Sequence, residues 1–196
     1  MKLCVYPWPN PVGDIEFWVN WLNYSREHLT CDYHIQLDAD EVLHENSFSE
    51  VLSHKTNHPH SVFCKRYNFW RDHKHLIPHG VVCSHNVVRI APSTVWLPSD
   101  GPHPLGSEAV QMAVQSNIEI FHFGFIRKRE AFFKKERLLQ KMFFNTHDKR
   151  LEAVESLPGN WMSEIKEVEW INKLIPYNGS YPKYATKWLT DRGYEL

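Results

Sequence analysis

The order of two hydrophobic periodicities along the chain constrains the fold more than any other feature of the sequence. Apolar residues alternate with polar ones, as is typical of β-strands, at Tyr33–Leu37 and in "NIEIFHFGF" (117–125). The apolar stretches "SVFCKRYNFW" (61–70) and "GVVCSHNVVRI" (80–90) predict two further strands. We expect these two strands to pair as a hairpin with a long loop, because a polar, proline-containing segment separates them.

Apolar residues at helical spacing occur towards both ends of the chain. They predict one helix in "GDIEFWVNWLNYSREHL" (13–29), before the strands. After the strands they predict a helix over 127–149 with a basic face, and another over 159–175. A short last helix is expected in "YPKYATKWLTDRGYEL" (181–196), with a proline in its first turn and a glycine at its end. Strands flanked by helices predict an α/β or α+β fold.

Length and composition favour a single globular domain over residues 1–196. Hydrophobic residues make up 42% of the chain, which is enough for a sizeable core. The formal net charge of −1 gives no long-range attraction to nucleic acid, so nucleic-acid binding is not expected. No apolar run approaches the ~20 residues needed to cross a bilayer. Four cysteines without a C-x-x-C pair, and an N-terminus unlike a signal peptide, favour a cytoplasmic location.

Three carboxylates, Asp38, Asp40 and Glu41, directly follow the first predicted strand. If the strand continued through them, Asp38 and Asp40 would point the same way about 6.6 Å apart and could reach one cation. Oxygen ligands suit Mg²⁺ or Mn²⁺, and Mg²⁺ often also binds the phosphate oxygens of a substrate. An EF-hand calcium loop is excluded because Val42 breaks its pattern. The aspartates can instead cap the next helix or turn, and the spacing alone leaves both interpretations open.

The segment "CDYHIQLDADEVL" (31–43) resembles the acidic signature of family 2 glycosyltransferases with the GT-A fold, of the phage and bacterial type. The likeness extends over nearly the whole chain from about Gly13. It includes a helix leading into the signature, two following strands, a histidine-containing strand before a basic helix, and the closing segment. These parts are found here in "NYSREHL" (23–29), "FCKRYNFWRDHKH" (63–75), "VVRI" (87–90), "IEIFHFGFIRKREAFFKKE" (118–136) and "YNGSYPKYATKWL" (177–189).

The resemblance implies a GT-A-like, Rossmann-like mixed sheet flanked by helices, with a partial sheet core over 1–126 and a C-terminal helical part over 127–196. It implies inverting transfer of a sugar from a nucleoside-diphosphate sugar to a hydroxyl of a glycan, lipid or other acceptor. The location would be the cytoplasm of a bacterium or of a phage-infected host cell. Family members carry a strand, a helix and further strands ahead of the signature. Because only 37 residues precede Asp38, we expect an N-terminally truncated form that lacks much of the nucleotide-binding half.

The resemblance also implies roles for the donor-side residues. Asp40 would ligate the Mn²⁺ or Mg²⁺ that holds the donor diphosphate. Asp38 would contact the nucleotide ribose or water on the metal, which makes it a second candidate metal residue, and Glu41 would orient the loop. His122 stands at the place of the family's late histidine and is a candidate metal or phosphate contact. A histidine satisfied at the end of a sheet is an equal alternative.

The acceptor side needs a carboxylate that takes the proton of the attacking hydroxyl. The candidates are Asp100 in "PSDGPHP" and Glu108 in "LGSEAV", although Asp100 can also belong to an Asp-Gly turn. The family's usual histidine–acid pair is displaced here, since His103 is followed by Pro104. Trp70 and Trp96 are candidates to stack on a sugar ring, although aromatics in so aromatic a chain are more often core residues. Arg66, Arg71 and Arg89 are candidates to bind phosphate, and they can instead pair with surface acids. Asp72 and His103 are further substrate candidates.

Two other functions compete with sugar transfer. A chain without a complete donor pocket can be a non-catalytic remnant that binds a carbohydrate or a protein partner. A zinc-binding module is the other alternative, although its spacing matches no tight zinc-ligand pair. Its candidate ligands lie in "HKHLIPHGVVCSH" (73–85) and are His73, His75, His79, Cys83 and His85.

Overall fold

The computed structural model describes residues 24, 27–57, 61–70, 72–78, 86–92, 111–126, 128–139 and 173–196. Most of the helix expected at 13–29 lies outside these ranges, and so does the chain from 140 to 172. The same holds for several candidate site residues: Arg71, His79, Cys83, His85, Trp96, Asp100, His103 and Glu108.

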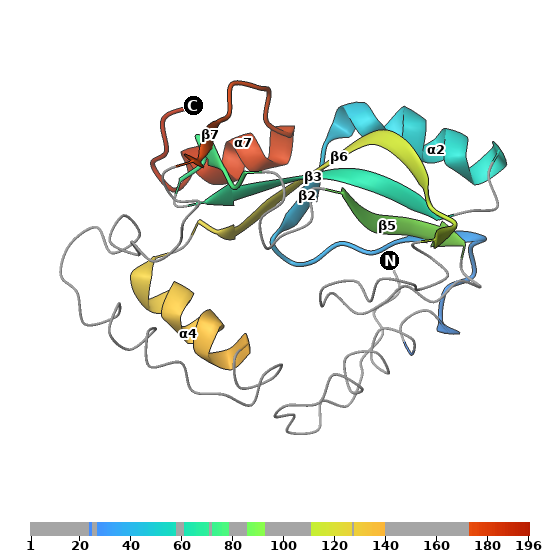
Figure 1. The fold of residues 1–196 in the computed structure, drawn as a ribbon, viewed down its shortest axis with the longest axis horizontal. Coiled ribbons are helices and arrows are strands. Elements are labelled where there is room, and N and C mark those ends of the chain that lie inside the picture. Colours follow the sequence, from blue (N-terminus) through green and yellow to red (C-terminus); the bar gives the residue numbers. More distant parts are fainter. Residues whose placement is uncertain are drawn as a thin grey trace.

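The described residues form seven strands and four helical segments (Figure 1). In chain order these are β1 (Tyr33–Ile35), β2 (Glu41–Leu43), the 3-10 helix η1 (Glu45–Ser47), α2 (Phe48–Asn57), β3 (Val62–Trp70), β4 (His75–Leu76), β5 (Asn86–Pro92), β6 (Val114–Phe125), α4 (Arg129–Leu139), β7 (Ile175–Pro176) and α7 (Lys183–Thr190).

Strands β3 and β6 form the centre of the sheet. They run parallel, with Asn68 beside His122, and every other strand pairing among the described residues is antiparallel. β5 lies on the other side of β3 and carries β1, while β2 pairs with β6. The mixed α/β class is therefore confirmed, and so is the expected pairing of β3 with β5. A largely antiparallel sheet argues against the Rossmann-like arrangement, because that arrangement needs successive parallel strands joined by helical crossovers.

Two apolar clusters hold the sheet together. One joins β3, β5 and β6 through Val62, Cys64 and Ile118, all of which are fully buried. The other joins the ends of β3 and β6 to α7, where Ala185 and Leu189 pack against the strand aromatics. Because β6 is covered on both faces, it is apolar almost without interruption towards its end, which is typical of a central strand.

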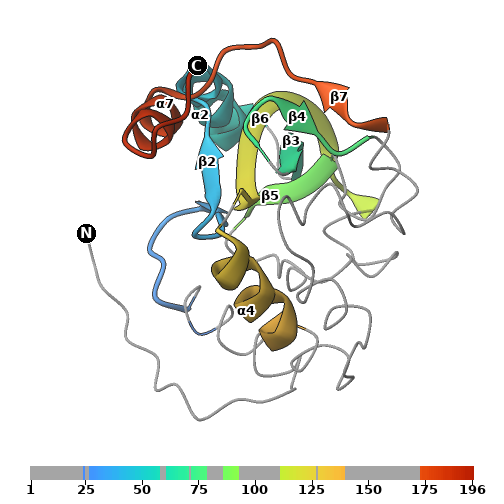
Figure 2. The same ribbon diagram turned by 90° about the vertical axis from the view of Figure 1, so that its left-hand side faces the viewer.

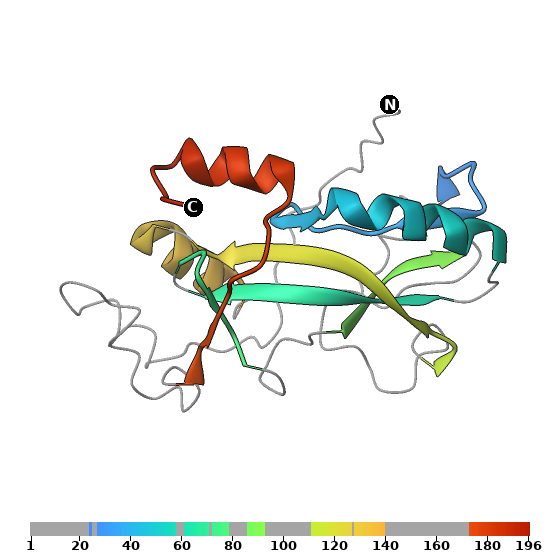
Figure 3. The ribbon, with the colours of Figure 1, turned by 90° about the horizontal axis from the view of Figure 1, so that it is seen from above.

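The helices lie around this sheet in different places. In Figures 1 and 2, α2 and α7 are on the upper side of the sheet and α4 is below, beside the end of β6. The view from above separates α7 from α2 and shows β3 and β6 side by side beneath them (Figure 3). The end of β6, the start of α4 and helix α7 therefore surround the same end of the sheet.

The predicted elements match the described ones with three differences. The burial of β1 is reversed: His34 is buried while Ile35 and Leu37 are exposed, because this three-residue strand pairs with β5 alone and its apolar face is not enclosed. Ile175, expected in a helix, lies in β7. Helix α2 was not predicted: its apolar Phe48 and Leu52 are exposed, while its packed side carries Val51 and the polar His54.

The last helix agrees with its prediction. Pro182 is the residue at its N-terminal boundary, and Gly193 follows its end with a φ of 80°. None of the helices that the structure describes is long and apolar enough to span a membrane.

Candidate functional site

The acidic cluster forms a tight turn between β1 and β2, so the strand does not continue through it. Residues 39 and 40 are in turn conformation, and the Glu41 amide donates to the Asp38 carbonyl over 2.9 Å. The Asp38 amide in turn donates to Glu41 Oε2 at 3.1 Å. The helical turn that follows has His44 as its N-cap, so the aspartates do not cap that helix, although both belong to a turn. As a result, Asp38 and Asp40 face different neighbours.

Asp38 and Glu41 form a buried charge quartet with Arg66 of β3 and Arg89 of β5. Glu41 Oε1 lies 2.7 Å from an Arg66 NH2 group and 2.8 Å from the NH2 group of Arg89. The same Arg89 nitrogen lies 2.7 Å from Asp38 Oδ2. The Glu41 side chain is completely buried, and that of Arg89 is 1% exposed.

The quartet is electrically neutral, with two carboxylates and two guanidinium groups. Charges removed from water are tolerated when they are paired and hydrogen-bonded. Arg66 and Arg89 thus have the ion-pairing role that the sequence left open, although their partners are the buried Glu41 and the partly buried Asp38. Because the quartet binds the turn at Asp38 and Glu41, it fixes the position of Asp40, which is one of the two residues between them.

Asp40 faces away from the quartet towards β6 and α4. Its carbonyl accepts a hydrogen bond from the Phe123 amide at 2.9 Å, which attaches the turn to β6. Its carboxylate has His122 on one side, with Oδ1 3.6 Å from Nε2, and Lys135 on the other, with Oδ2 2.9 Å from Nζ. Asp40 and His122 together with Asn68, which binds the histidine, are called the Asp40–His122 site below.

Asn68 determines which nitrogen of His122 faces Asp40. His122 Nδ1 lies 2.9 Å from Asn68 Oδ1, and an amide oxygen only accepts hydrogen bonds, so Nδ1 carries a proton. In the neutral imidazole Nε2 then presents its lone pair towards the Asp40 carboxylate. Two acceptors at this separation repel each other unless a proton or a metal cation lies between them. A proton on Nε2, or a cation between the two groups, would turn this repulsion into an attraction.

Gly124 leaves the room that this arrangement needs. It lies two residues after His122 on β6, and in a strand such residues share a face. A methyl group at Gly124 would overlap His122 Nε2 and would lie 2.7 Å from Asp40 Oδ2. Any larger residue at this position would push the two side chains apart.

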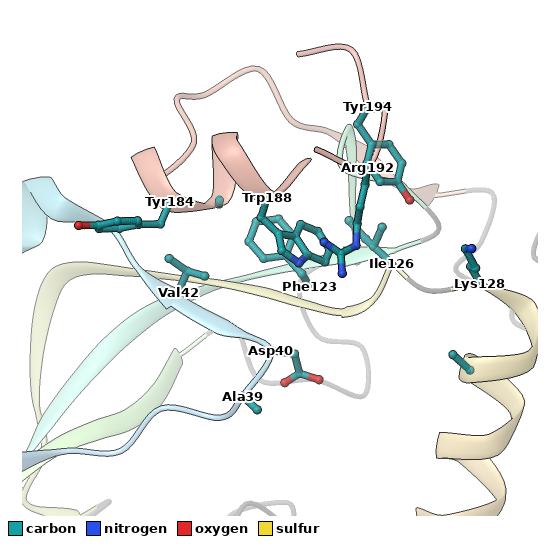
Figure 4. Close-up of a pocket in the computed structure, with 12 residues that line it drawn as sticks. Ala39, Asp40, Val42, Phe123, Ile126, Lys128, Tyr184, Trp188, Arg192 and Tyr194 are labelled. Atoms are coloured by element: carbon teal, nitrogen blue, oxygen red, sulfur yellow. The ribbon is translucent and has the colours of Figure 1, made fainter. Parts of the chain in front are cut away.

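A cleft of about 610 Å³ opens beside Asp40 (Figure 4). Its apolar lining includes Val42 and Phe123 from the sheet, and α7 contributes Trp188 to the opposite wall. Figure 4 shows Asp40 below this wall, on the other side of the β6 ribbon from Trp188, with its carboxylate pointing away from α7. Asp40 is therefore the residue of the Asp40–His122 site that lines the cleft, whereas His122 and Asn68 lie buried behind it.

The remaining described candidates lie outside this group. Trp70 is 6% exposed and packs against Phe125 and Phe132, so its ring belongs to the core behind the site. Asp72 is in the turn after β3, where it accepts from the Lys74 amide and binds the His75 ring at 2.7 Å.

The zinc alternative finds no support in the part of the chain that the structure covers. No group of three or more histidine, cysteine, aspartate or glutamate side chains is placed to hold a metal ion there. His73 Nε2 is bound by the Glu195 carbonyl at 2.8 Å, and His75 is bound by Asp72.

Sequence reasoning missed Asn68, Gly124 and Lys135 as parts of the site. Gly124 had a recognisable signal, because glycine inside a strand often marks the close approach of another group. Lys135 was included only in a basic helical face, and nothing in that pattern distinguishes it from its neighbours. Asn68 reaches His122 through the register of β3 and β6, which a single sequence does not reveal.

Comparisons with protein-family models, with curated proteins and with solved structures gave no match for this chain. The candidate function therefore depends on the geometry described above and on the motifs of the sequence.

Proposed function

We propose that this protein is a metal-dependent glycosyltransferase that transfers a sugar from a nucleoside-diphosphate sugar to an acceptor hydroxyl, with inversion. Its described strands would then be the part of a GT-A-like sheet that carries the acidic signature. The proposal combines the resemblance of "YHIQLDADEVL" (33–43) and "IEIFHFGF" (118–125) to family 2 members with the chemistry of the Asp40–His122 site.

One observation carries the proposal: the two resembling segments meet at their functional residues. β2 and β6 pair so that Glu41 lies opposite His122, and this register puts Asp40 Oδ1 3.6 Å from His122 Nε2. A carboxylate oxygen and an imidazole nitrogen are a suitable donor set for Mn²⁺, and two protein ligands leave positions for phosphate oxygens. The residues present thus fit the metal that the resemblance implies.

Asp40 and His122 would hold the cation, which when bound would neutralise the charge that develops on the leaving diphosphate. In the transfer, the acceptor oxygen forms a bond to the anomeric carbon while the bond between that carbon and the diphosphate oxygen breaks. The acceptor proton passes to a carboxylate, for which Asp100 and Glu108 are the candidates. The charge quartet keeps Asp38 beside this site, where the ribose of the donor would lie.

Lys135 adds a second positive group on the same side. Its ammonium lies 2.9 Å from Asp40 Oδ2 and 5.8 Å from the centre of the Phe125 ring. When the diphosphate binds, the ammonium is close enough to pair with a phosphate oxygen in place of the carboxylate. We propose that Lys135 balances the charge of Asp40 before the donor binds and that of the diphosphate afterwards.

Calorimetry with a panel of nucleoside-diphosphate sugars, with and without Mn²⁺, tests the proposal. We expect Mn²⁺-dependent binding of at least one donor, and a roughly 10-fold or greater loss of affinity in Asp40→Asn. Gly124→Ala should weaken binding similarly, because its methyl group displaces His122 and Asp40. Release of the nucleoside diphosphate in the presence of an acceptor then distinguishes turnover from binding alone.

Gly193→Ala is the matched control for the glycine variant. It lies beyond α7 at a φ of 80°, with nothing near its added methyl group, so it should lower stability while donor binding stays unchanged. Absence of binding by every donor, or equal binding by wild type and Asp40→Asn, would contradict the proposed function.

A further inference from the structure

The wall of the cleft opposite Asp40 contains a positively charged group that the proposed donor site does not use. α7 and the residues after it contribute Tyr184, Trp188, Arg192 and Tyr194 to this wall. Figure 4 shows Arg192 beside Trp188, with Asp40 lower in the view. A ligand in the cleft would lie between this wall and the catalytic turn.

Arg192 is held in place by an aromatic ring. Its guanidinium carbon lies 4.2 Å from the centre of the Trp188 ring, at cation–π distance. Stacking of this kind engages the face of the guanidinium group and leaves its N–H groups, which point outward in the plane, able to bind an anion as a fork. The Trp188 ring is in turn packed on Phe123 of β6, with ring centres 5.7 Å apart.

The cleft has more positive than negative charge. Its charged lining residues are Arg192, Lys128 and Asp40. Asp40 is already neutralised by Lys135 at 2.9 Å. Neither Arg192 nor Lys128 forms an ion pair with a carboxylate among the residues that the structure describes. Two cations above an already balanced carboxylate favour an anionic ligand.

The rest of the lining favours a sugar ring over a bare ion. Tyr184 is 75% exposed at one end of the cleft, so an aromatic face is open to solvent there. The apolar lining from Val42, Phe123 and Ile126 continues this surface. The C–H faces of a pyranose pack well against aromatic and aliphatic side chains, whereas an inorganic anion gains nothing from them.

We propose that this cleft binds the acceptor, and that the acceptor is a glycan residue with an anionic substituent, of which the carboxylate of a uronic acid is the simplest. Arg192 and Lys128 bind the anionic group, and Tyr184 packs against a sugar ring. A hydroxyl of the same glycan then lies on the side of Asp40. The assignment of this ligand as the acceptor rests on the proposed transferase function, whereas its binding does not.

NMR titration without metal or sugar nucleotide tests the binding. The matched probes are cellobiouronic acid and cellobiose, which differ only in a carboxylate in place of a hydroxymethyl group. We expect the acid to bind roughly 10-fold more tightly, because it gains charge-assisted hydrogen bonds. The double variant Lys128→Gln/Arg192→Gln should lose this preference. Lys74→Gln/Lys187→Gln, which removes equal charge from residues outside the cleft lining, should retain it.

Further variants and probes separate the parts of the ligand. Tyr184→Ala should weaken the acid and cellobiose by the same factor. A preference for a cellobiose phosphate over the uronic acid would assign phosphate as the anionic substituent. Equal affinity for the acid and for cellobiose would overturn the proposal, and so would equal affinity for inorganic phosphate and the acid.

Two results distinguish this inference from the proposed function. If the protein bound the uronic acid but no sugar nucleotide, the proposed glycan-binding cleft would be supported and the proposed transferase function would be contradicted. Conversely, if Lys128→Gln/Arg192→Gln lost donor binding while its preference for the acid was unchanged, the two cations would serve the donor diphosphate, and the acceptor assignment would be wrong.

Discussion

At the scale of single residues, the position of Asp40 depends on what its neighbours in the sequence bind. Asp38 and Glu41, on either side of it, are fixed by arginines of two different strands. The Asp40 carboxylate itself faces His122 and Lys135. One short acidic segment thus supplies both a neutral, largely buried anchor and an aspartate that lines the cleft.

Removal of the Lys135 charge should strengthen Mn²⁺ binding in the absence of nucleotide. The ammonium at 2.9 Å from Asp40 Oδ2 competes with a metal for the same carboxylate. We expect Lys135→Gln to bind Mn²⁺ roughly 5-fold more tightly, the effect of a partly screened ion pair worth about 1 kcal/mol. Calorimetry with the metal alone measures this change.

The adjacent Lys134→Gln is the control, because it removes the same charge from an exposed position of α4. If both variants changed Mn²⁺ affinity equally, the effect would come from the overall charge of the helix and not from the contact with Asp40. A comparison of donor binding by the same two variants tests whether Lys135 also pairs with the diphosphate. If it does, Lys135→Gln should weaken donor binding and Lys134→Gln should not.

Glu41→Gln should strongly destabilise the fold. Glu41 Oε1 accepts from both Arg66 and Arg89, and an amide in its place leaves two buried guanidinium groups with one carboxylate. Breaking a buried charge network in this way costs about 3 kcal/mol or more. Urea denaturation followed by circular dichroism measures the change, with the exposed Glu130→Gln as control. A loss below that of the control would mean that the quartet is not a stabilising anchor.

At the scale of elements, helix α7 is tied to the turn region by a carboxylate that is distant in sequence. Pro182, at the start of the helix, makes no side-chain capping hydrogen bond. The Glu45 side chain supplies one instead, because the Lys183 amide donates to its two oxygens at 3.1 and 3.0 Å. The negative charge also suits the positive end of the helix dipole. The cleft wall is thus attached to the region that follows the turn at Asp38–Glu41.

This attachment should depend on pH. Hydrogen bonds from the backbone amides of Glu45 and Lys183 lower the pKa of the Glu45 carboxyl below its ordinary 4.5. A lowered folded-state pKa stabilises the fold fully above pH 4.5, and this contribution is lost as the pH falls through the lowered value. We expect Glu45→Gln to reduce Tm by roughly 2 °C at pH 7, and the difference from wild type to disappear towards pH 3.

Thermal unfolding between pH 3 and pH 7 tests this expectation. Glu195→Gln, at an exposed position near the C-terminus, serves as the control for a general effect of charge. A difference between wild type and Glu45→Gln that is the same at pH 3 and pH 7 would mean that the carboxylate charge does not hold α7.

Local patterns predicted some elements and not others for physical reasons. β3, β6 and α7 have buried faces that follow the strand or helix period, so their local sequences predict them. For the segment at Asp38 and Asp40 the spacing left an extended strand and a turn both open, and the bonds between Asp38 and Glu41 close it into a turn. The partners of Asp40 come from β6 and α4, and their approach depends on strand register and helix placement that no local pattern contains.

At the scale of the whole molecule, the two apolar clusters lie at different places on the same strands. Cys64 belongs to the cluster between β3, β5 and β6 and has no exposed surface. Burial raises the pKa of its thiol to about 12, so the native protein keeps it protonated at neutral pH. The stability that this contributes is complete below the ordinary thiol pKa of 9.0 and declines as the pH rises above it.

The reactivity of Cys64 should therefore report unfolding of the whole sheet. In a variant in which serine replaces Cys4, Cys31 and Cys83, we expect maleimide labelling at pH 7 to be negligible in the native state. It should rise with urea in step with the loss of circular dichroism, because the thiolate forms only after the cluster opens. A variant that retains Cys31 alone, which is exposed, should label rapidly without urea. Rapid labelling of Cys64 well below the unfolding transition would show instead that β3 and β5 separate locally, and the cluster would then not be the cooperative centre of the fold.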